Sequence, residues 1–356
     1  MKTLKRTWAD ISLDNLEYNY RSIRAHLPQG TKFLGVMKAD AYGHGAVPVS
    51  RALADLGAEY LAVSNLEEAV QIRRGEVRLP ILILGYTPAE YAANMIFLDI
   101  TQEVHSLEYA RELNEALAGT NYILNVHLKL DTGMTRIGFF AYDDERTLDE
   151  LRQVAQLPHL HIEGVFMHFC VADSRAEADV SFTKLQYKRF MDMLSAMAGV
   201  GIRPEIRHCC NSGATILYPE FALDMVRPGI ITYGNAPSDE LEGALSLRPM
   251  MSLHSMIAQV RTVPAGTDIS YGRLYRTKEE TRVAVLPIGY ADGLSRLLTG
   301  KASFYLQGHQ VPVIGRICMD MCMIDVSGVP EAKPGDVVTI FGYDDDGTLL
   351  PCERLA

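Results

Sequence analysis

Long hydrophobic runs are absent from this 356-residue sequence. No apolar stretch reaches the roughly 18 residues that a membrane-spanning helix needs, so no membrane partner is expected. The N-terminal residues MKTLKRTWADI also lack the apolar stretch of a secretory signal. The sequence therefore predicts a cytoplasmic protein.

The sequence contains few cysteines, and it has fewer positively than negatively charged residues. The six cysteines are too scattered for a disulfide scaffold, and no pair has CxxC spacing, so we expect reduced, mostly buried thiols and no metal. Lysine and arginine number 34 against 44 aspartates and glutamates, and the net charge of −10 argues against nucleic acid as a partner. Hydrophobic residues, at 48%, are plentiful enough for a large core, and the chain length favours about two domains.

Short apolar, β-branched runs alternate with segments of helical spacing, such as Val104–Leu117 and Phe182–Met197, in the first part of the chain. This alternation indicates βαβ units and a parallel sheet, and eight strands in about 200 residues fit a closed (β/α)8 barrel of the TIM type better than an open sheet. The predicted strands are Phe33–Ala39, Tyr60–Ser64, Ile81–Leu84, Ile96–Thr101, Tyr122–Leu130, Ile162–His168, Glu205–Cys210 and Val226–Tyr233.

The pattern changes after Gly234. From Met250 onward, strand-like runs such as TRVAVLPIGYA and GDVVTIFG are separated by proline and glycine turns, and helical spacing is scarce. The sequence thus predicts an α/β barrel at 11–235, followed by a mostly-β C-terminal domain at 236–356 that residues 1–10 join. We expect the linker near Asn235–Glu242.

Lys38 ends the first predicted barrel strand, in FLGVMKADAYGHG. Chemistry in a parallel barrel takes place at the carboxyl ends of the strands. Burial there would lower the pKa of a lysine, and its neutral amine could then form a Schiff base with the aldehyde of pyridoxal phosphate. From position alone, a lysine that only extends to the rim is equally consistent with the sequence.

A phosphate could bind near the ends of the seventh and eighth predicted strands. Asn211, Ser212 and Gly213 open a predicted helix whose N–H groups and dipole suit an anion, and Gly229 and Ile230 follow the eighth strand. By itself, an NSG sequence at a helix start is more often simply an N-cap.

Several motifs in a fixed order carry a resemblance to a known family. They are VMKADAYGHG at 36–45, KLDTGMTRIGF at 129–139, CNSGATIL at 210–217, VRPGIITYG at 226–234, ISYGRLY at 269–275, LPIGYADGLSR at 286–296 and GRICMDMCMIDV at 315–326. Over nearly its whole length the chain resembles the alanine racemases, barrel-type enzymes that use pyridoxal phosphate.

The resemblance implies a pair of catalytic bases. Lys38 would hold the cofactor and act as one base, and Tyr271 would act as the other. Two bases on opposite faces of the α-carbon answer the need to remove a proton from one face and return one to the other. His168 would hydrogen-bond the tyrosine and lie near Arg227, which would face the pyridine nitrogen, and His208 would hydrogen-bond that arginine from behind.

Further contacts to cofactor and substrate are implied in the same way. Arg136 would contact the phenolic oxygen of the cofactor and the carboxylate of the substrate, and Lys129, which is often carbamylated in the family, would brace it. Tyr42 would lie in the phosphate region and Tyr290 at the entrance. The phosphate itself would be held by Asn211, Ser212, Gly229 and Ile230.

The family's partner subunit supplies the residues that match Tyr271 and Met319, the latter through its backbone N–H to the substrate carboxylate. The resemblance therefore implies a homodimer with shared active sites. Four more residues match polar positions at the family's substrate entrance, although such charges more often belong to an ordinary surface: Asp173, Arg296, Arg316 and Asp320.

The sequence departs from the family at its end, CERLA. Family members usually continue into a segment with a TINYE-like motif, whose tyrosine touches the cofactor phosphate. We expect either that the sequence is truncated or that the site is completed differently.

The predicted function is interconversion of L- and D-alanine, which supplies D-alanine for peptidoglycan. A serine or broad-specificity amino-acid racemase also fits, because an apolar pocket discriminates weakly against one added hydroxyl. Two further classes of protein fit the sequence less well. A pyridoxal-phosphate-binding protein with impaired turnover would lack the β domain with Tyr271, and a fold-related decarboxylase would lack a residue like Arg227.

Overall fold

The computed structural model describes residues 5–142 and 144–355. The described chain divides into two compact units: Leu13–Arg248 is one, and in the other residues 5–12 pack with residues 249–355. This division differs from the boundary predicted at 235, because residues 236–248 pack with the first unit. The Arg248 amide donates to Asn19 Oδ1 at 2.7 Å, and the hydroxyls of Tyr18 and Ser246 are hydrogen-bonded at 2.7 Å.

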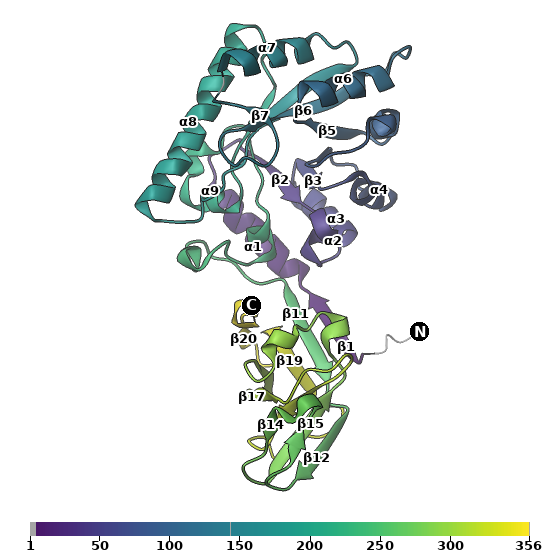
Figure 1. Cartoon of the computed structure of the whole chain (residues 1–356), viewed down its shortest axis with the longest axis vertical. Coiled ribbons are helices and arrows are strands. Elements are labelled where there is room, and N and C mark those ends of the chain that lie inside the picture. Colours follow the sequence, from purple (N-terminus) through teal and green to yellow (C-terminus); the bar gives the residue numbers. More distant parts are fainter. Residues whose placement is uncertain (1–4, 143, 356) are drawn as a thin grey trace. The chain divides into compact units, whose positions relative to one another are not determined.

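The first unit is a closed barrel of parallel strands with helices around it (Figure 1). Strand order runs β5-β4-β3-β2-β10-β9-β8-β6, and pairing of β5 with β6 closes the ring, so the predicted (β/α)8 barrel is confirmed. A short strand, β7 (Phe139–Phe140), pairs with the end of β6. The barrel strands are β2 (Lys32–Val36), β3 (Tyr60–Val63), β4 (Ile81–Ile83), β5 (Ile100–Val104), β6 (Leu124–Asp131), β8 (Leu160–Phe166), β9 (Ile206–His208) and β10 (Met225–Val226).

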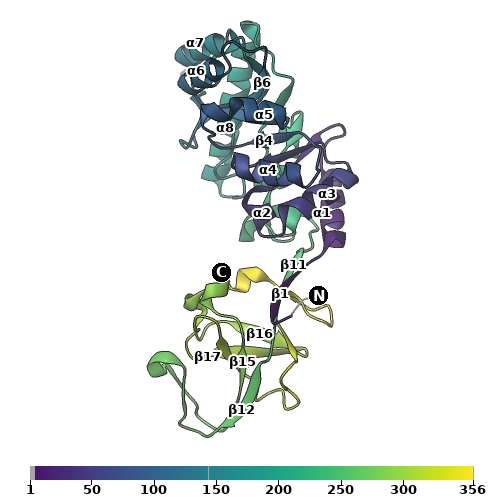
Figure 2. The same cartoon turned by 90° about the vertical axis from the view of Figure 1, so that its right-hand side faces the viewer.

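Helices cover the strands of the barrel, as the turned view in Figure 2 shows for α4 to α7. Helix α4 illustrates how the sequence sets their ends, because Asn65 caps its first turn by accepting from the Glu68 amide, and arginines in its last turn complement the dipole. The barrel helices are α1 (Leu13–His26), α3 (Ala46–Leu56), α4 (Leu66–Arg74), α5 (Ala92–Phe97), α6 (Leu107–Ala116), α7 (Asp144–Ala155), α8 (Glu177–Gly199) and α9 (Ser212–Leu217).

Three predicted strands are clearly wrong in extent. The first, predicted at Phe33–Ala39, ends at Val36, because the backbone turns after it. The fourth, predicted at Ile96–Thr101, is Ile100–Val104, because Ile96 lies in α5 and its apolar side belongs to a helix. The eighth, predicted at Val226–Tyr233, ends at Val226, since Pro228 cannot donate to a sheet ladder. Residues Ile230–Tyr233 form a short 3₁₀ helix, η3.

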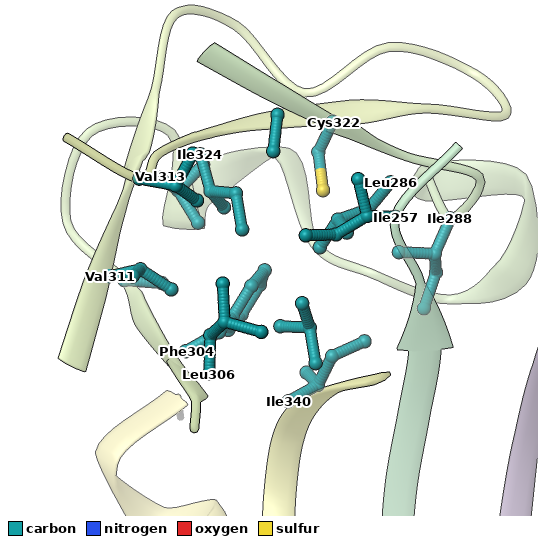
Figure 3. Packing of buried hydrophobic residues seen from close by; sticks show 14 of the residues in the cluster. Ile257, Leu286, Ile288, Phe304, Leu306, Val311, Val313, Cys322, Ile324 and Ile340 are labelled. Atoms are coloured by element: carbon teal, nitrogen blue, oxygen red, sulfur yellow. The ribbon is translucent and has the colours of Figure 1, made fainter. Parts of the chain in front are cut away.

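The second unit is mostly β-structure, as predicted. Its main sheet is antiparallel in the order β1-β11-β19-β16-β17-β18-β15-β12, with β20 paired to β19. Apolar residues alternate along several of these strands, and most of them meet in a main core. Figure 3 shows Phe304, Leu286 and Ile324 pointing toward one another there. The strands are β1 (Thr7–Ile11), β11 (Met251–Met256), β12 (Gln259–Val263), β15 (Thr281–Leu286), β16 (Ser303–Leu306), β17 (His309–Ile314), β18 (Cys322–Asp325), β19 (Val337–Tyr343) and β20 (Leu349–Leu350).

A separate two-stranded ribbon in this unit joins β13 (Asp268–Ile269) to β14 (Tyr275–Arg276). The turn between them is a short 3₁₀ segment, η5 (Tyr271–Arg273). The ribbon therefore places Tyr271 at the tip of a hairpin.

All six cysteines are free. Cys209, Cys210 and Cys322 are buried, whereas Cys170 is exposed and the other two are partly exposed, so the prediction of mostly buried thiols holds for only half of them. Within the described ranges, no helix combines the length and hydrophobicity needed to cross a membrane.

Candidate active site

Lys38 begins a left-handed turn rather than ending a strand. Strand β2 stops at Val36, and α2 (Lys38–Tyr42) winds through Ala39, Asp40 and Ala41 at φ of 52–54°. For non-glycine residues this conformation costs roughly 1–2 kcal/mol each. The Lys38 side chain is exposed in the single chain, which contradicts the expectation that the strand end itself desolvates the amine.

Two carboxylates hold this turn in place. Asp40 Oδ1 accepts from the Ala46 amide at 2.7 Å. Glu68 accepts from two loops at once, with Oε1 bound to the Ala39 amide and Oε2 to the Ser64 amide, both at 2.7 Å. The residue after Lys38 is thereby tied to the end of β3. Glu68 was not predicted from the sequence, although an Asn-x-x-Glu pattern at a helix start often marks a carboxylate that reaches back to backbone amides.

Glu68→Gln is expected to loosen the turn that carries Lys38. A glutamine can accept at only one of the two amides, and its NH₂ group would oppose the other donor, so a loss of about 1–3 kcal/mol in unfolding free energy is expected. We also expect a roughly tenfold lower turnover, since the backbone beside Lys38 would shift. Denaturant unfolding and steady-state kinetics check this, with the exposed neighbour Glu67→Gln as matched control. Equal behaviour of the two variants would contradict the assignment.

Arg227 is the central buried charge of the barrel. It follows β10, and its side chain donates to His208 Nδ1 at 2.9 Å and to the carbonyls of Met167 and Cys209 at 2.8 and 3.1 Å. Its Nη2 lies 3.5 Å from His168 Nδ1. Burial lowers the pKa of Arg227 to about 10, so the guanidinium stays charged at neutral pH. The expected neighbours His208 and His168 are therefore both beside it.

His168 and His208 are neutral in this environment. Burial, and then the charge of Arg227, hold the pKa of each well below its usual range. Since an arginine can only donate, the facing Nδ1 of each ring accepts, and each Nε2 carries the proton. His168 thus keeps one ring N–H donor, on Nε2.

A small cradle lies where α9 and η3 begin. Asn211 caps α9 by accepting from the Ala214 amide, and Ser212 Oγ accepts from the Gly229 amide at 2.9 Å. A side chain at Gly229 would meet the Tyr42 hydroxyl at 2.8 Å, so the glycine leaves this space free. Burial raises the pKa of Tyr42, which keeps its hydroxyl a donor. Ile230 follows directly as the first residue of η3.

Lys129 and Arg136 come from β6 and the loop after it. Lys129 is buried with its Nζ 4.7 Å from the centre of the Phe166 ring, and its pKa is held well below the usual range by burial, then by Arg227 and Arg136. Arg136 is exposed, and the loop before it is held by Asp131 Oδ1, which accepts from two loop amides. The loop after β8 is fixed by Asp173, whose carbonyl accepts from Ser238 Oγ at 2.6 Å.

In the second unit, the remaining predicted site residues lie around one cavity. Tyr271 and Met319 are 70% and 53% exposed and line a cavity of about 690 Å³, together with Asp320 and Cys318. Ser270 Oγ donates to the Arg316 carbonyl at 2.7 Å and ties the Tyr271 turn to the strand end opposite. The unit thus presents a phenol and a backbone turn on one surface.

The turn that carries Met319 is packed against the segment that contains Tyr290. The Tyr290 amide donates to the Cys318 carbonyl at 3.0 Å, and a side chain at Gly289 would collide with this backbone. The Arg296 guanidinium lies 5.5 Å from the centre of the Tyr290 ring, a cation–π contact. Tyr290, Arg296, Arg316 and Asp320 therefore belong to the same unit as Tyr271.

The barrel residues fit pyridoxal phosphate. The site offers an amine at Lys38, whose Nζ lies 5.9 Å from the centre of the Tyr42 ring, and a space bounded by the Tyr42 and Ser212 hydroxyls that a Cβ at Gly229 would fill. Arg227 adds a buried, permanently charged donor. Across residues 5–142 and 144–355, no group of three or more His, Cys, Asp or Glu side chains is arranged to hold a metal ion.

Comparison with known proteins assigns both units to one family. The sequence profile of the alanine racemase N-terminal domain matches residues 11–237, and that of the C-terminal domain matches residues 250–356. The chain is 46% identical over 349 residues to an alanine racemase of Desulfovibrio desulfuricans, covering 98% of this chain and 91% of the relative. It is 42% identical to an alanine racemase of Clostridium tetani, covering 99% and 90%.

Solved structures agree with the sequence relatives. An alanine racemase of Clostridium difficile superposes with a TM-score of 0.92 at 39% identity, covering 100% of this chain and 90% of that one. The Bacillus anthracis alanine racemase, solved with bound L-Ala-P, has the same TM-score at 33% identity and the same coverage. The chain therefore belongs to the alanine racemase family of pyridoxal-phosphate-dependent racemases.

Proposed function

We propose that this protein interconverts L-alanine and D-alanine with Lys38 and Tyr271 as two bases, and so supplies D-alanine for peptidoglycan. The observation that carries the proposal is the setting of Arg227, a buried guanidinium held by His208 and the Met167 carbonyl at the end of the barrel where Lys38 lies. A permanent donor there suits a ring nitrogen that stays unprotonated.

The cofactor assignment follows from the same residues. Pyridoxal phosphate, when bound, supplies an electron sink for the bonds at the α-carbon. Lys38 would hold it covalently through Nζ. The hydroxyls of Ser212 and Tyr42 and the backbone at Gly229 and Ile230 would bind the phosphate, with Asn211 fixing the first turn of α9.

The two bases serve opposite faces of the substrate. Lys38 Nζ would take or return a proton on one face of the α-carbon, and Tyr271 Oη would do so on the other. Arg136 would bind the substrate carboxylate, together with the Met319 amide. His168 retains a proton on Nε2 and could hydrogen-bond Tyr271.

We further propose a homodimer in which each active site combines a barrel with the β unit of the partner. Tyr271, Met319 and Asp320 are exposed on the single chain around one hollow, as expected for residues that complete a neighbouring site. Tyr290, Arg296 and Arg316 lie on the same unit and would line the entrance with Asp173. Lys129, which is buried and whose pKa is lowered by that burial and by the charges of Arg227 and Arg136, would support Arg136.

Proton exchange tests the proposal directly. Each enantiomer of alanine is incubated with the purified enzyme in heavy water, and loss of the α-proton signal and formation of the opposite enantiomer are followed. We expect both enantiomers to exchange and to interconvert. L-serine is assayed in parallel, because equal kcat/KM for serine would favour the broad-specificity racemase. Cofactor binding without exchange would identify a binding protein instead.

A further inference from the structure

A chain of side-chain hydrogen bonds extends from Arg227 into the barrel interior. His208 accepts from Arg227 through Nδ1, and its Nε2 lies 2.9 Å from His127 Nδ1. His127 Nε2 lies 3.1 Å from Glu163 Oε2. Both histidines are fully buried, on β9 and β6, and Glu163 lies on β8. Neither His127 nor Glu163 was predicted from the sequence to have a role.

The hydrogen bonds in this series can run, from donor to acceptor, in only one direction. Arginine has no acceptor, so His208 Nδ1 must be unprotonated and its proton must lie on Nε2. That proton faces His127 Nδ1, which must therefore accept, and this leaves the His127 proton on Nε2, facing Glu163. The hydrogen bonds thus run from Arg227 at one end to Glu163 at the other, through two neutral rings of fixed tautomer.

Glu163 is built to anchor the chain as an anion. Its Oε2 also accepts from the hydroxyls of Tyr60 at 2.7 Å and Thr101 at 3.2 Å. Burial raises the pKa of Glu163, but the hydrogen bonds from His127 and Tyr60 outweigh it and lower the pKa to about 2. For His127, in contrast, burial lowers the pKa, because it disfavours the charged imidazolium, and the ring stays neutral. An ionised carboxylate is acceptor-only and matches the three donors.

The backbone makes room for the His127 ring. A Cβ at Gly164 would lie 2.5–2.6 Å from the ring atoms of His127, which no side chain tolerates. The pairing of β6 with β8 also shifts register between Val126 and His127, a local irregularity directly beside the ring. Glycine in a strand interior often marks such a close approach.

We propose that His127 and Glu163 are positioning residues that fix the tautomer of His208 and thereby hold the Arg227 guanidinium against the cofactor ring. If the direction of the chain reversed, a proton on His208 Nδ1 would oppose the Arg227 donor, and the guanidinium would lose its partner. Glu163 prevents this reversal because it can only accept. This inference rests on the proposed function for the role of Arg227, but the direction of the hydrogen bonds does not.

The wild-type protein itself supplies the first test. Nitrogen-15 NMR of protein with labelled histidine distinguishes protonated from unprotonated ring nitrogens. We expect His127 and His208 to be neutral with the proton on Nε2, with assignments taken from the variants His127→Asn and His208→Asn. A protonated Nδ1 on His208 would overturn the proposal. This measurement requires no turnover.

Three variants test the positioning role. Glu163→Met removes the acceptor and should change the tautomer signals of both histidine rings. It should also lower kcat for alanine roughly 10- to 100-fold, the loss seen when a residue that hydrogen-bonds a metal ligand is removed. The change in KM should be smaller. Glu163→Gln keeps an acceptor and should restore both the tautomers and kcat to within about threefold. Tyr60→Phe is the matched control, because it removes a hydrogen bond to the same Oε2 without altering the direction of the chain.

The outcomes separate this proposal from the proposed function. Wild-type kcat in folded Glu163→Met would overturn the positioning role while leaving racemization intact. Equal kcat losses in Glu163→Met and Tyr60→Phe would show a general effect of barrel stability and also overturn it. If Glu163→Met does not fold, the tautomers measured in the wild-type protein and the kcat of Glu163→Gln test the positioning role instead. Correct tautomers in a protein without α-proton exchange would contradict the proposed function but not the direction of the chain.

Discussion

Lys38→Ala should abolish α-proton exchange with both enantiomers of alanine, with a loss of about 10⁴-fold or more, as for removal of other covalent catalytic groups. The side chain both holds the cofactor and serves one face of the substrate in the proposed function, so no other residue can replace it. Because the side chain is exposed, the free energy of unfolding should change by less than about 0.5 kcal/mol.

The measurement is exchange in heavy water, accompanied by absorbance of the bound cofactor and by denaturant unfolding. Lys32→Ala is the matched control, since Lys32 is also an exposed lysine and begins the same strand whose end precedes Lys38. It should retain wild-type exchange and colour. Exchange above about 1% of wild type in Lys38→Ala would show that the amine is not the essential group.

Tyr271→Phe should slow exchange unequally for the two enantiomers. The phenol serves only one face of the α-carbon in the proposed mechanism, and removal of a general base typically costs about 10²- to 10⁴-fold. Exchange of one enantiomer should fall by that factor, while the other, served by Lys38, should fall less. Cofactor absorbance should stay unchanged. Tyr275→Phe, in the same ribbon, is the control.

Mixing the Lys38→Ala and Tyr271→Phe variants tests whether the phenol comes from the partner. In a mixed dimer of Lys38→Ala and Tyr271→Phe chains, shared sites would pair one intact Lys38 with one intact Tyr271. Roughly one site in four should then be complete, because half of the dimers are mixed and half of their sites are intact. If mixing restores no activity after demonstrated subunit exchange, each site is built from a single chain.

The barrel strands could be located from sequence because parallel strands buried on both faces are nearly continuous apolar runs. Their ends could not, since the apolar residues of α5 and η3 extend the same runs into helical backbone. Ile96 and Ile230 carry β-branched side chains in helical segments, where packing overrides propensity.

The candidate site could be predicted only in part. Lys38, Ser212 and Arg227 stand directly after apolar runs, where a parallel barrel places its chemistry. His127 and Glu163 are polar residues within predicted strands, and the sequence does not show which side chains face each other across a barrel. The left-handed conformation of the Lys38 turn could not be predicted from the sequence either, because KADAY contains no glycine to mark positive φ.

The left-handed turn after Lys38 limits how this enzyme could be redesigned. Its coil has the opposite hand to an ordinary α-helix, so an inserted or deleted residue would rotate the amine away from Tyr42 rather than merely lengthen a loop. Libraries that aim at new substrates should therefore leave 38–42 and the proposed base Tyr271 untouched. Residues 272–273 of the hairpin tip and the 318–321 turn are better targets, since side chains there already reach solvent.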